Sequence, residues 1–172
     1  MSRIAPLAMA FASLAFATAA WADVAASDRK FVEGAALGGM AEVELSKVAT
    51  ARGSTLQIRQ FAQRLVNDHR KMNRELKQVA STKGIVVPTS LDAKDQKAVE
   101  ELKKRDAKKF DREYMEMMVR DHRKDVAEFQ QAIRNTKDPD IKAFASSALL
   151  TLKDHLQLAL EGLAALPKKA GK

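Results

Sequence analysis

Three histidines are the residues of this chain best suited to chemistry, and each directly follows an aspartate. They stand in the pairs 68–69, 121–122 and 154–155, and the chain holds no other histidine. Imidazole nitrogens bind transition metals, exchange protons near neutral pH, or join buried hydrogen-bond networks. The chain has no cysteine, so disulfides, iron–sulfur clusters, cysteine-bound zinc and thiol catalysis are excluded.

Helical periodicity places these histidines, together with one glutamate, on apolar helix faces. Apolar residues at helical spacing predict four long helices, over residues 28–52, 54–84, 107–135 and 139–166. Glu42 interrupts the apolar face of the first helix, and His69, His122 and His155 lie on those of the other three. All four residues fall within about two positions of mid-helix, which is roughly 3 Å of rise. Mid-helix residues of an antiparallel bundle share one level, so we expect the four side chains to meet in the core.

Such a polar cluster is costly to bury unless it is compensated. Three imidazoles and one carboxylate can hold a Zn, Mn, Fe or Cu ion, so the candidate ligands are Glu42, His69, His122 and His155. Around them, the candidates for orienting the ligands are Asp68, Asp121, Asp154 and Tyr114. An aspartate in this role would orient the imidazole of a neighbouring helix. The alternative is a structural network in which Glu42 accepts hydrogen bonds from the histidines and fixes the helix register.

Two methionines near the histidines bear on the choice of metal. Met72 comes three residues after His69, and Met118 comes four before His122. Thioethers suit Cu(I), whereas methionines at helical spacing also fill gaps in apolar cores.

Capping residues support the predicted helix boundaries. Ser, Thr and Asp favour helix starts, and Gly favours the position after a helix end. The predicted caps are Ser27, a capping box at 54–57, Asp106 and Asp138 at helix starts, and Gly53 and Gly84 at helix ends. An extended connection over 85–90 precedes a short helix that begins at Leu91 or Asp92 and ends near Lys104. The pattern equally allows one bent helix over 92–135.

These elements predict an all-α fold: an antiparallel four-helix bundle, with the short extra helix in the connection between the second and third long helices. Aromatic residues make up 5% of the chain, and no stretch alternates with a period of two, so no sheet is expected.

The first residues read as a targeting segment. Arg3 precedes an Ala/Leu/Phe-rich stretch that ends in Ala20-Trp21-Ala22, which fits a signal-peptidase site. We therefore predict a cleavable signal peptide over 1–22, a bundle domain over 23–167 and a basic, disordered tail over 168–172. The alternative for the first segment is an uncleaved membrane anchor. A secretory signal predicts a periplasmic location, or one outside the cell.

The chain is basic, with a net charge of +8 and a pI near 9.8. An exported protein meets no genomic DNA, and no nucleic-acid-binding motif is present, so a nucleic-acid partner is not expected. Positive charge would favour peripheral contact with an anionic envelope surface; the alternative is an ordinary solvated helix surface. Phosphate-binding loops and nucleophile elbows are also missing from the sequence, which argues against the familiar hydrolase classes.

Four segments carry a resemblance to a known family. They read FVEGAALGGMAEVELSKVA, FAQRLVNDH, FDREYMEMMVRDH and DPDIKAFASSALLTLKDH. Over about residues 28–166 the chain resembles a family of exported bacterial domains of unknown function, whose members are often labelled predicted outer membrane proteins. The resemblance implies a ferritin-like four-helix fold and, with the label, association with the outer membrane.

A ferritin-like fold raises the question of a di-iron centre, which needs Glu-x-x-His on two helices. The residues three before the histidines are Val66, Val119 and Leu152, so this pattern is missing. The remaining hypothesis is an exported bundle that binds one transition-metal ion and acts in metal or envelope stress. The alternative is a non-enzymatic envelope or interaction protein whose histidine network is structural.

Overall fold

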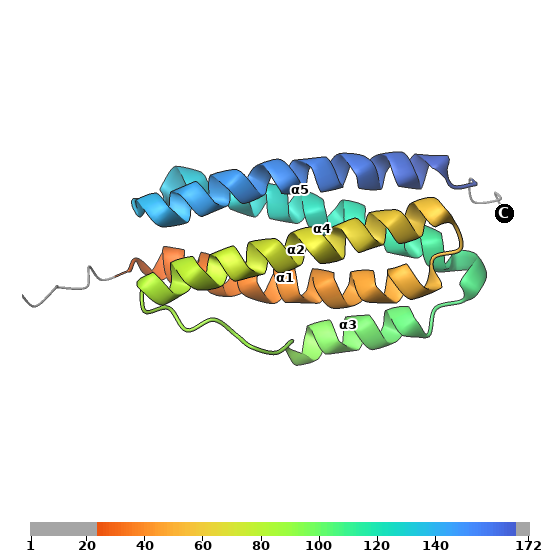
Figure 1. Cartoon of the computed structure of the whole chain (residues 1–172), viewed down its shortest axis with the longest axis horizontal. Coiled ribbons are helices and arrows are strands. Elements are labelled where there is room, and N and C mark those ends of the chain that lie inside the picture. The colour runs from red at the N-terminus through yellow and green to blue at the C-terminus, as the bar shows by residue number, and fades with distance from the viewer. Residues whose placement is uncertain (1–23, 168–172) are drawn as a thin grey trace, which may run out of the picture.

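The computed structural model describes residues 24–167, and all the regular structure in this range is helical (Figure 1). The helices are α1 (Ala26–Arg52), α2 (Leu56–Thr82), α3 (Ala93–Lys103), α4 (Ala107–Asn135) and α5 (Pro139–Ala165). The predicted all-α class is confirmed. The predicted signal peptide over 1–22 and the tail over 168–172 lie outside the described residues.

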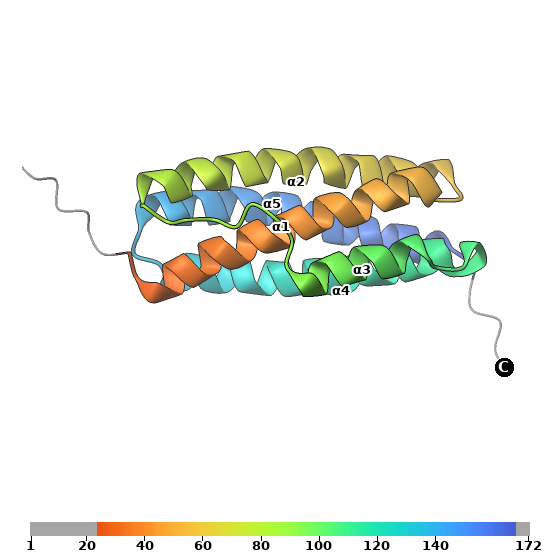
Figure 2. The same ribbon diagram turned by 90° about the horizontal axis from the view of Figure 1, so that it is seen from below.

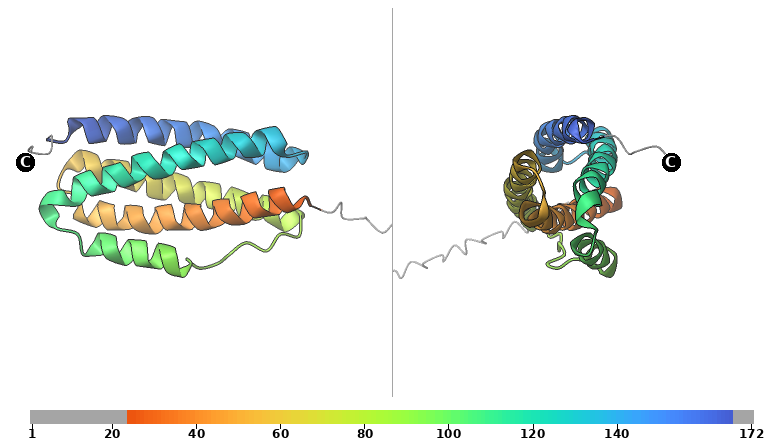
Figure 3. Two further views of the ribbon diagram at one scale, coloured as in Figure 1. Left: turned by 180° about the vertical axis from the view of Figure 1, so that it is seen from behind. Right: turned by 90° about the vertical axis from the view of Figure 1, so that its right-hand side faces the viewer.

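The four long helices lie side by side as two hairpins. α1 packs against α2, and α4 packs against α5; α2 then contacts α5, and α1 contacts α4. Neighbouring helices in this arrangement run antiparallel, whereas α2 and α4 run in the same direction (Figures 1 and 2). The segment between them must therefore return along the whole bundle. It carries α3, which lies outside the four-helix core against α1 (Figure 3).

The break between α3 and α4 decides between the two sequence alternatives. α3 ends at Lys103, α4 begins at Ala107, and the Asp106 side chain caps α4 by accepting from the Lys108 amide at 2.9 Å. The chain thus forms two helices here instead of one bent helix. Arg52, at the end of α1, donates to the carbonyl oxygens of Leu102 (3.0 Å) and Arg105 (2.6 Å), which fixes this turn.

Two of the predicted caps are wrong. α1 begins at Ala26, so Ser27 already lies inside the helix, and Ala25 takes the N-cap position without a side-chain hydrogen bond. Before α2, Thr55 caps the helix through Ile58 (3.2 Å), because Ser54 instead donates its amide and hydroxyl to Asp111 of α4.

The glycines at the two predicted helix ends play different parts. Gly84 has a φ of 64°, the left-handed conformation that suits glycine after a helix end. Gly53 has a φ of −53°, so it does not form the left-handed cap. A Cβ atom there would lie 2.9 Å from both the Ala49 carbonyl oxygen and Ile58 Cγ2, so close packing is what requires glycine.

The core consists of two apolar clusters, one toward each end of the bundle. One includes Leu45, Leu65, Met115 and Ala159. The other includes Val32, Leu76, Phe144 and Ala145. The four candidate ligands lie between them: on α2, for example, Leu65 and Met72 belong to opposite clusters, and His69 falls between the two. A buried polar level thus divides the apolar core.

Candidate metal centre

Three helices bring the three histidines together at this level. His69 of α2, His122 of α4 and His155 of α5 are 3%, 0% and 0% exposed. One ring nitrogen from each forms a set in which all three atoms lie within 4.8 Å of one another. The ring centroids are 5.3–5.6 Å apart. We call these three residues the histidine triad.

Hydrogen bonds to outer partners fix two of the three rings. The Met118 carbonyl, one turn earlier on α4, lies 3.0 Å from His122 Nδ1. The Asp68 carboxylate of α2 lies 2.9 Å from His155 Nε2. A carbonyl and a carboxylate only accept, so each of these nitrogens carries the proton and donates it outward.

The remaining nitrogens of these two rings then face each other with lone pairs. In neutral imidazoles the inward atoms, His122 Nε2 and His155 Nδ1, are unprotonated, and they lie 3.3 Å apart. Two facing lone pairs repel unless a proton or a cation lies between them. Two nitrogens bound to one ion at about 2.0–2.1 Å in tetrahedral geometry are about 3.3–3.4 Å apart. The observed spacing therefore suits a shared metal ion.

Burial disfavours the other way to relieve this repulsion, which is to add a proton. It lowers the pKa of His122 to about 4, with His155 adding to the effect. It also lowers the pKa of His155, although the Asp68 carboxylate opposes that shift. Burial lowers the pKa of His69 well below its ordinary value, and the other two histidines lower it further. All three imidazoles are thus held neutral, the form that binds metal.

Two buried polar atoms of the described chain have no hydrogen-bond partner: His69 Nε2 and Glu42 Oε2. His69 belongs to the triad, so one of its nitrogens is free to bind an ion. Glu42 is only 4% exposed, but it is not a member of the close set that the three histidines form. Burial raises the pKa of Glu42 well above its ordinary value, and the nearby Asp125 carboxylate raises it further. The structure thus brings together three of the four candidate ligands.

The four residues expected to orient the ligands differ in whether they contact the histidine triad. Asp68 contacts His155 across a helix interface. Asp154 pairs with Arg64 at the surface, and Asp121 with Arg120 at 3.2 Å. The Tyr114 hydroxyl is buried against the Ser46 hydroxyl at 3.0 Å. Asp68 alone of these four forms a hydrogen bond to the triad.

Sequence reasoning missed the role of the Met118 backbone. Its carbonyl orients His122 simply because it lies four residues earlier in the helix. The four-residue spacing within a helix predicts this contact, whereas the types of the residues do not. The side chain of Met118 packs in one apolar cluster and that of Met72 in the other, so both act as core residues in this structure.

Comparison with known proteins places the chain in a family. The model of a domain of unknown function, DUF4142, matches residues 13–161. The chain belongs to the DUF4142 family. No curated protein matches it.

Two solved structures resemble this DUF4142 chain in fold. A DUF305 fragment from Deinococcus radiodurans is 14% identical, with a TM-score of 0.74, over 84% of this chain and all of that one. A structure of CopM in the Cu(I)-bound form is also 14% identical, with a TM-score of 0.66, over 78% of this chain and 93% of that one. Identity at this level shows a shared helical fold. Within residues 24–167, no helix has the length and apolar character needed to cross a membrane.

Proposed function

We propose that this DUF4142 protein binds one transition-metal ion between His69, His122 and His155. The observation that carries the proposal is the pair of inward nitrogens 3.3 Å apart, whose outward partners leave both without protons. A third buried imidazole completes the set. Three neutral imidazoles suit Zn, Cu, Fe or Mn, and they leave at least one coordination position open.

Copper is the first metal to test, because a structure of similar fold is described as the Cu(I)-bound form of CopM. Glu42 is the proposed fourth ligand: its unpartnered Oε2 would join the three nitrogens when the ion binds. The proposed role is storage, buffering or sensing of the metal during metal or envelope stress.

We also propose where the protein works. The sequence of residues 1–22 supports export to the periplasm, and the net charge of +8 supports peripheral contact with an anionic envelope surface such as the outer membrane. The two hairpins and their one long crossover connection support a ferritin-like bundle.

A second candidate function rests on the hydrogen bonds themselves. A chain from Met118 through His122 and His155 to Asp68 crosses the interface between α2, α4 and α5. Such a network can fix helix register without metal in an envelope or interaction protein. This candidate needs a proton between the two inward nitrogens, which their lowered pKa values disfavour.

Elemental analysis distinguishes the two candidates. The protein is purified without a polyhistidine tag, and its metal content is measured with that of a triple variant, His69→Gln, His122→Gln and His155→Gln. We expect near-stoichiometric metal in the parent and none in the variant. Glu42→Gln, measured in parallel, tests the fourth ligand. No metal in the parent, and no uptake of Zn, Mn, Fe or Cu, would leave the structural network as the function.

A further inference from the structure

A cavity of about 620 Å³ reaches the histidine triad from the outside of the bundle. Residues of all four long helices line it, and His69 belongs both to its lining and to the triad. The volume falls within the range of about 300–1,000 Å³ that small-molecule sites occupy. The cavity is thus large enough for a ligand and adjoins the proposed metal.

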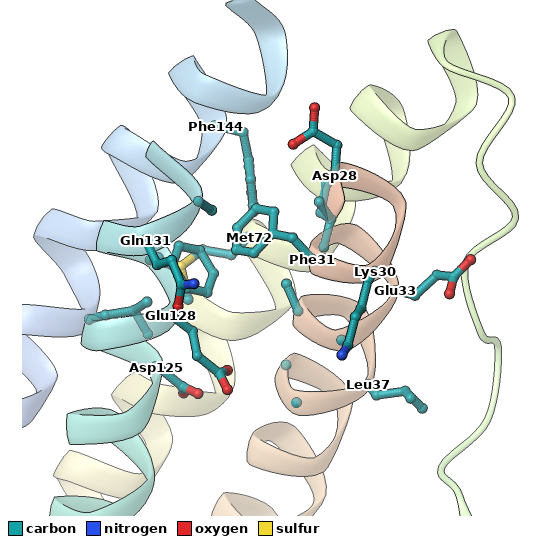
Figure 4. Close-up of a pocket in the computed structure, with 18 of the residues that line it drawn as sticks. Asp28, Lys30, Phe31, Glu33, Leu37, Met72, Asp125, Glu128, Gln131 and Phe144 are labelled. Atoms are coloured by element: carbon teal, nitrogen blue, oxygen red, sulfur yellow. The ribbon is translucent and has the colours of Figure 1, made fainter. Parts of the chain in front are cut away.

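The walls of this cavity are mainly apolar and aromatic. Phe31 of α1, Met72 of α2 and Phe144 of α5 lie near one another at one end, as Figure 4 shows. Phe129 of α4 packs edge-on against Phe31, with 4.9 Å between the ring centroids. Flat rings at this spacing suit a ligand with an apolar, aromatic body.

Glycines of α1 keep one wall of the cavity free of side chains. Gly34 and Gly38 line the cavity, and a Cβ atom added at either would meet no heavy atom within 4 Å. Glycine inside a helix costs roughly 0.5–1 kcal/mol relative to alanine. Nothing in the packing requires these two glycines, so the space they leave is the feature that distinguishes them.

The charged residues around the cavity include both signs. Two basic residues, Lys30 and Lys124, stand in its lining with four acidic ones, Asp28, Glu33, Asp125 and Glu128. Burial raises the pKa of Asp125 to about 7, so its carboxyl group carries only a partial charge near neutrality. Acidic residues outnumber basic ones, which disfavours an anionic ligand, and the apolar walls favour a neutral one.

We propose that this cavity binds a small, mainly apolar molecule that carries one nitrogen, oxygen or sulfur donor, and that the donor completes the coordination of the ion held by the triad. The inference rests on the proposed function: the three histidines hold the ion, and the outside donor would take the coordination position of Glu42, whose carboxylate is not part of the close set of the three histidines. His69 is the residue that joins the cavity to the ion. The protein would then bind its metal together with an organic ligand.

Co(II) and two imidazoles test this proposal. The protein is loaded with one equivalent of Co(II), whose visible spectrum reports its ligands, and is titrated with imidazole or with 4-phenylimidazole. Both probes carry the same donor, and only the second has an apolar body to fill the cavity. We expect 4-phenylimidazole to bind at least tenfold more tightly, with a change in the Co(II) spectrum.

A variant with a filled cavity and a matched control at an exposed position test whether the cavity causes this preference. The double variant Gly34→Leu and Gly38→Leu places side chains in open space, and Ala51→Leu adds the same side chain at an exposed position of α1. The double variant should keep its Co(II) and lose the preference for 4-phenylimidazole, whereas Ala51→Leu should keep both.

The outcomes separate the two proposals. If Co(II) binds but the preference is absent, or survives in the filled variant, the cavity proposal is wrong and the metal site stands. If the parent shows no bound Co(II) and the triple histidine variant behaves identically, the metal site fails and the cavity proposal fails with it.

Discussion

At the scale of single residues, His155 shows how the site is organised. One of its nitrogens faces Asp68 at 2.9 Å, and the other faces His122 at 3.3 Å. The carboxylate fixes the ring's proton on the outer nitrogen and makes the inner, unprotonated nitrogen a stronger metal ligand. Asp68 is part-exposed while His155 is fully buried, so the negative charge stays near water and the neutral ring carries the contact inward.

Removal of the Asp68 charge should therefore weaken metal binding without loss of the fold. We expect Asp68→Asn to lower metal affinity about 10–100-fold, the usual effect of losing a group that orients a metal-bound histidine. A competition titration against a coloured chelator measures the affinity. Asp121→Asn is the control, because Asp121 directly precedes His122 yet pairs with Arg120 at 3.2 Å. Equal losses in the two variants would contradict the role given to Asp68.

Glu42 should make the stability of the metal-free protein depend on pH. Burial raises its pKa in the folded state, so the folded protein holds this proton more tightly than the unfolded chain does. At a pH below the pKa of Glu42 in the unfolded chain, Glu42 is protonated in both states and does not change the free energy of unfolding. As the pH rises from that value toward the pKa of Glu42 in the folded protein, the unfolded chain loses the proton first, and the free energy of unfolding falls. Glu42→Gln should thus raise the free energy of unfolding at pH 8 by on the order of 1 kcal/mol and have less effect at pH 4.

Urea unfolding at several pH values measures this effect. The control is Glu44→Gln, at an exposed position of the same helix that pairs with Lys47. A loss of stability at pH 8 in the Glu42 variant would show that the buried carboxylate has a stabilising partner, and the prediction would then be wrong.

At the scale of helices, the sequence was informative where a pattern is local and periodic. The 3.6-residue period predicted each long helix, and the mid-helix positions predicted that three histidines meet, because rise per residue sets depth in a bundle. Caps were less predictable: Thr55 and not Ser54 caps α2, because Asp111, distant in sequence, accepts the hydrogen bonds of Ser54. Glu42 is buried as expected, but its carboxylate is not part of the close set of the three histidines, because side-chain packing is not encoded in periodicity.

Alanine substitutions at three glycines in and after α1 should change the stability of the protein in opposite directions. Alanine at Gly34 or Gly38 meets no atom within 4 Å, so each substitution should stabilise the protein by about 0.5–1 kcal/mol through helix propensity. Gly53→Ala should instead destabilise it by about 1 kcal/mol or more, since the new Cβ would lie 2.9 Å from a backbone oxygen. Urea unfolding followed by far-UV circular dichroism gives all three values. Destabilisation by Gly34→Ala or Gly38→Ala would indicate a packing role that the structure does not show.

At the scale of the whole molecule, the triad joins both hairpins. His69 comes from the first hairpin, and His122 and His155 come from the second. A bound ion would therefore add a link between two units that also meet through apolar packing, the hydrogen bond from His155 to Asp68 and the Arg64–Asp154 ion pair. In contrast, α3 contributes only Val99 and Leu102 to the buried residues, and it packs against α1 outside the bundle.

This division predicts where metal binding stabilises the protein. An ion that binds only the folded state should raise its stability by about 2.7 kcal/mol at a free concentration of 100 times Kd. Thermal unfolding should show this increase in the parent and not in His122→Gln. Hydrogen exchange should show slower amide exchange in the middle of α2, α4 and α5, while α3 continues to open locally at its own rate. Protection confined to one hairpin would mean that the ion does not join the two, and the three-histidine site would have to be abandoned.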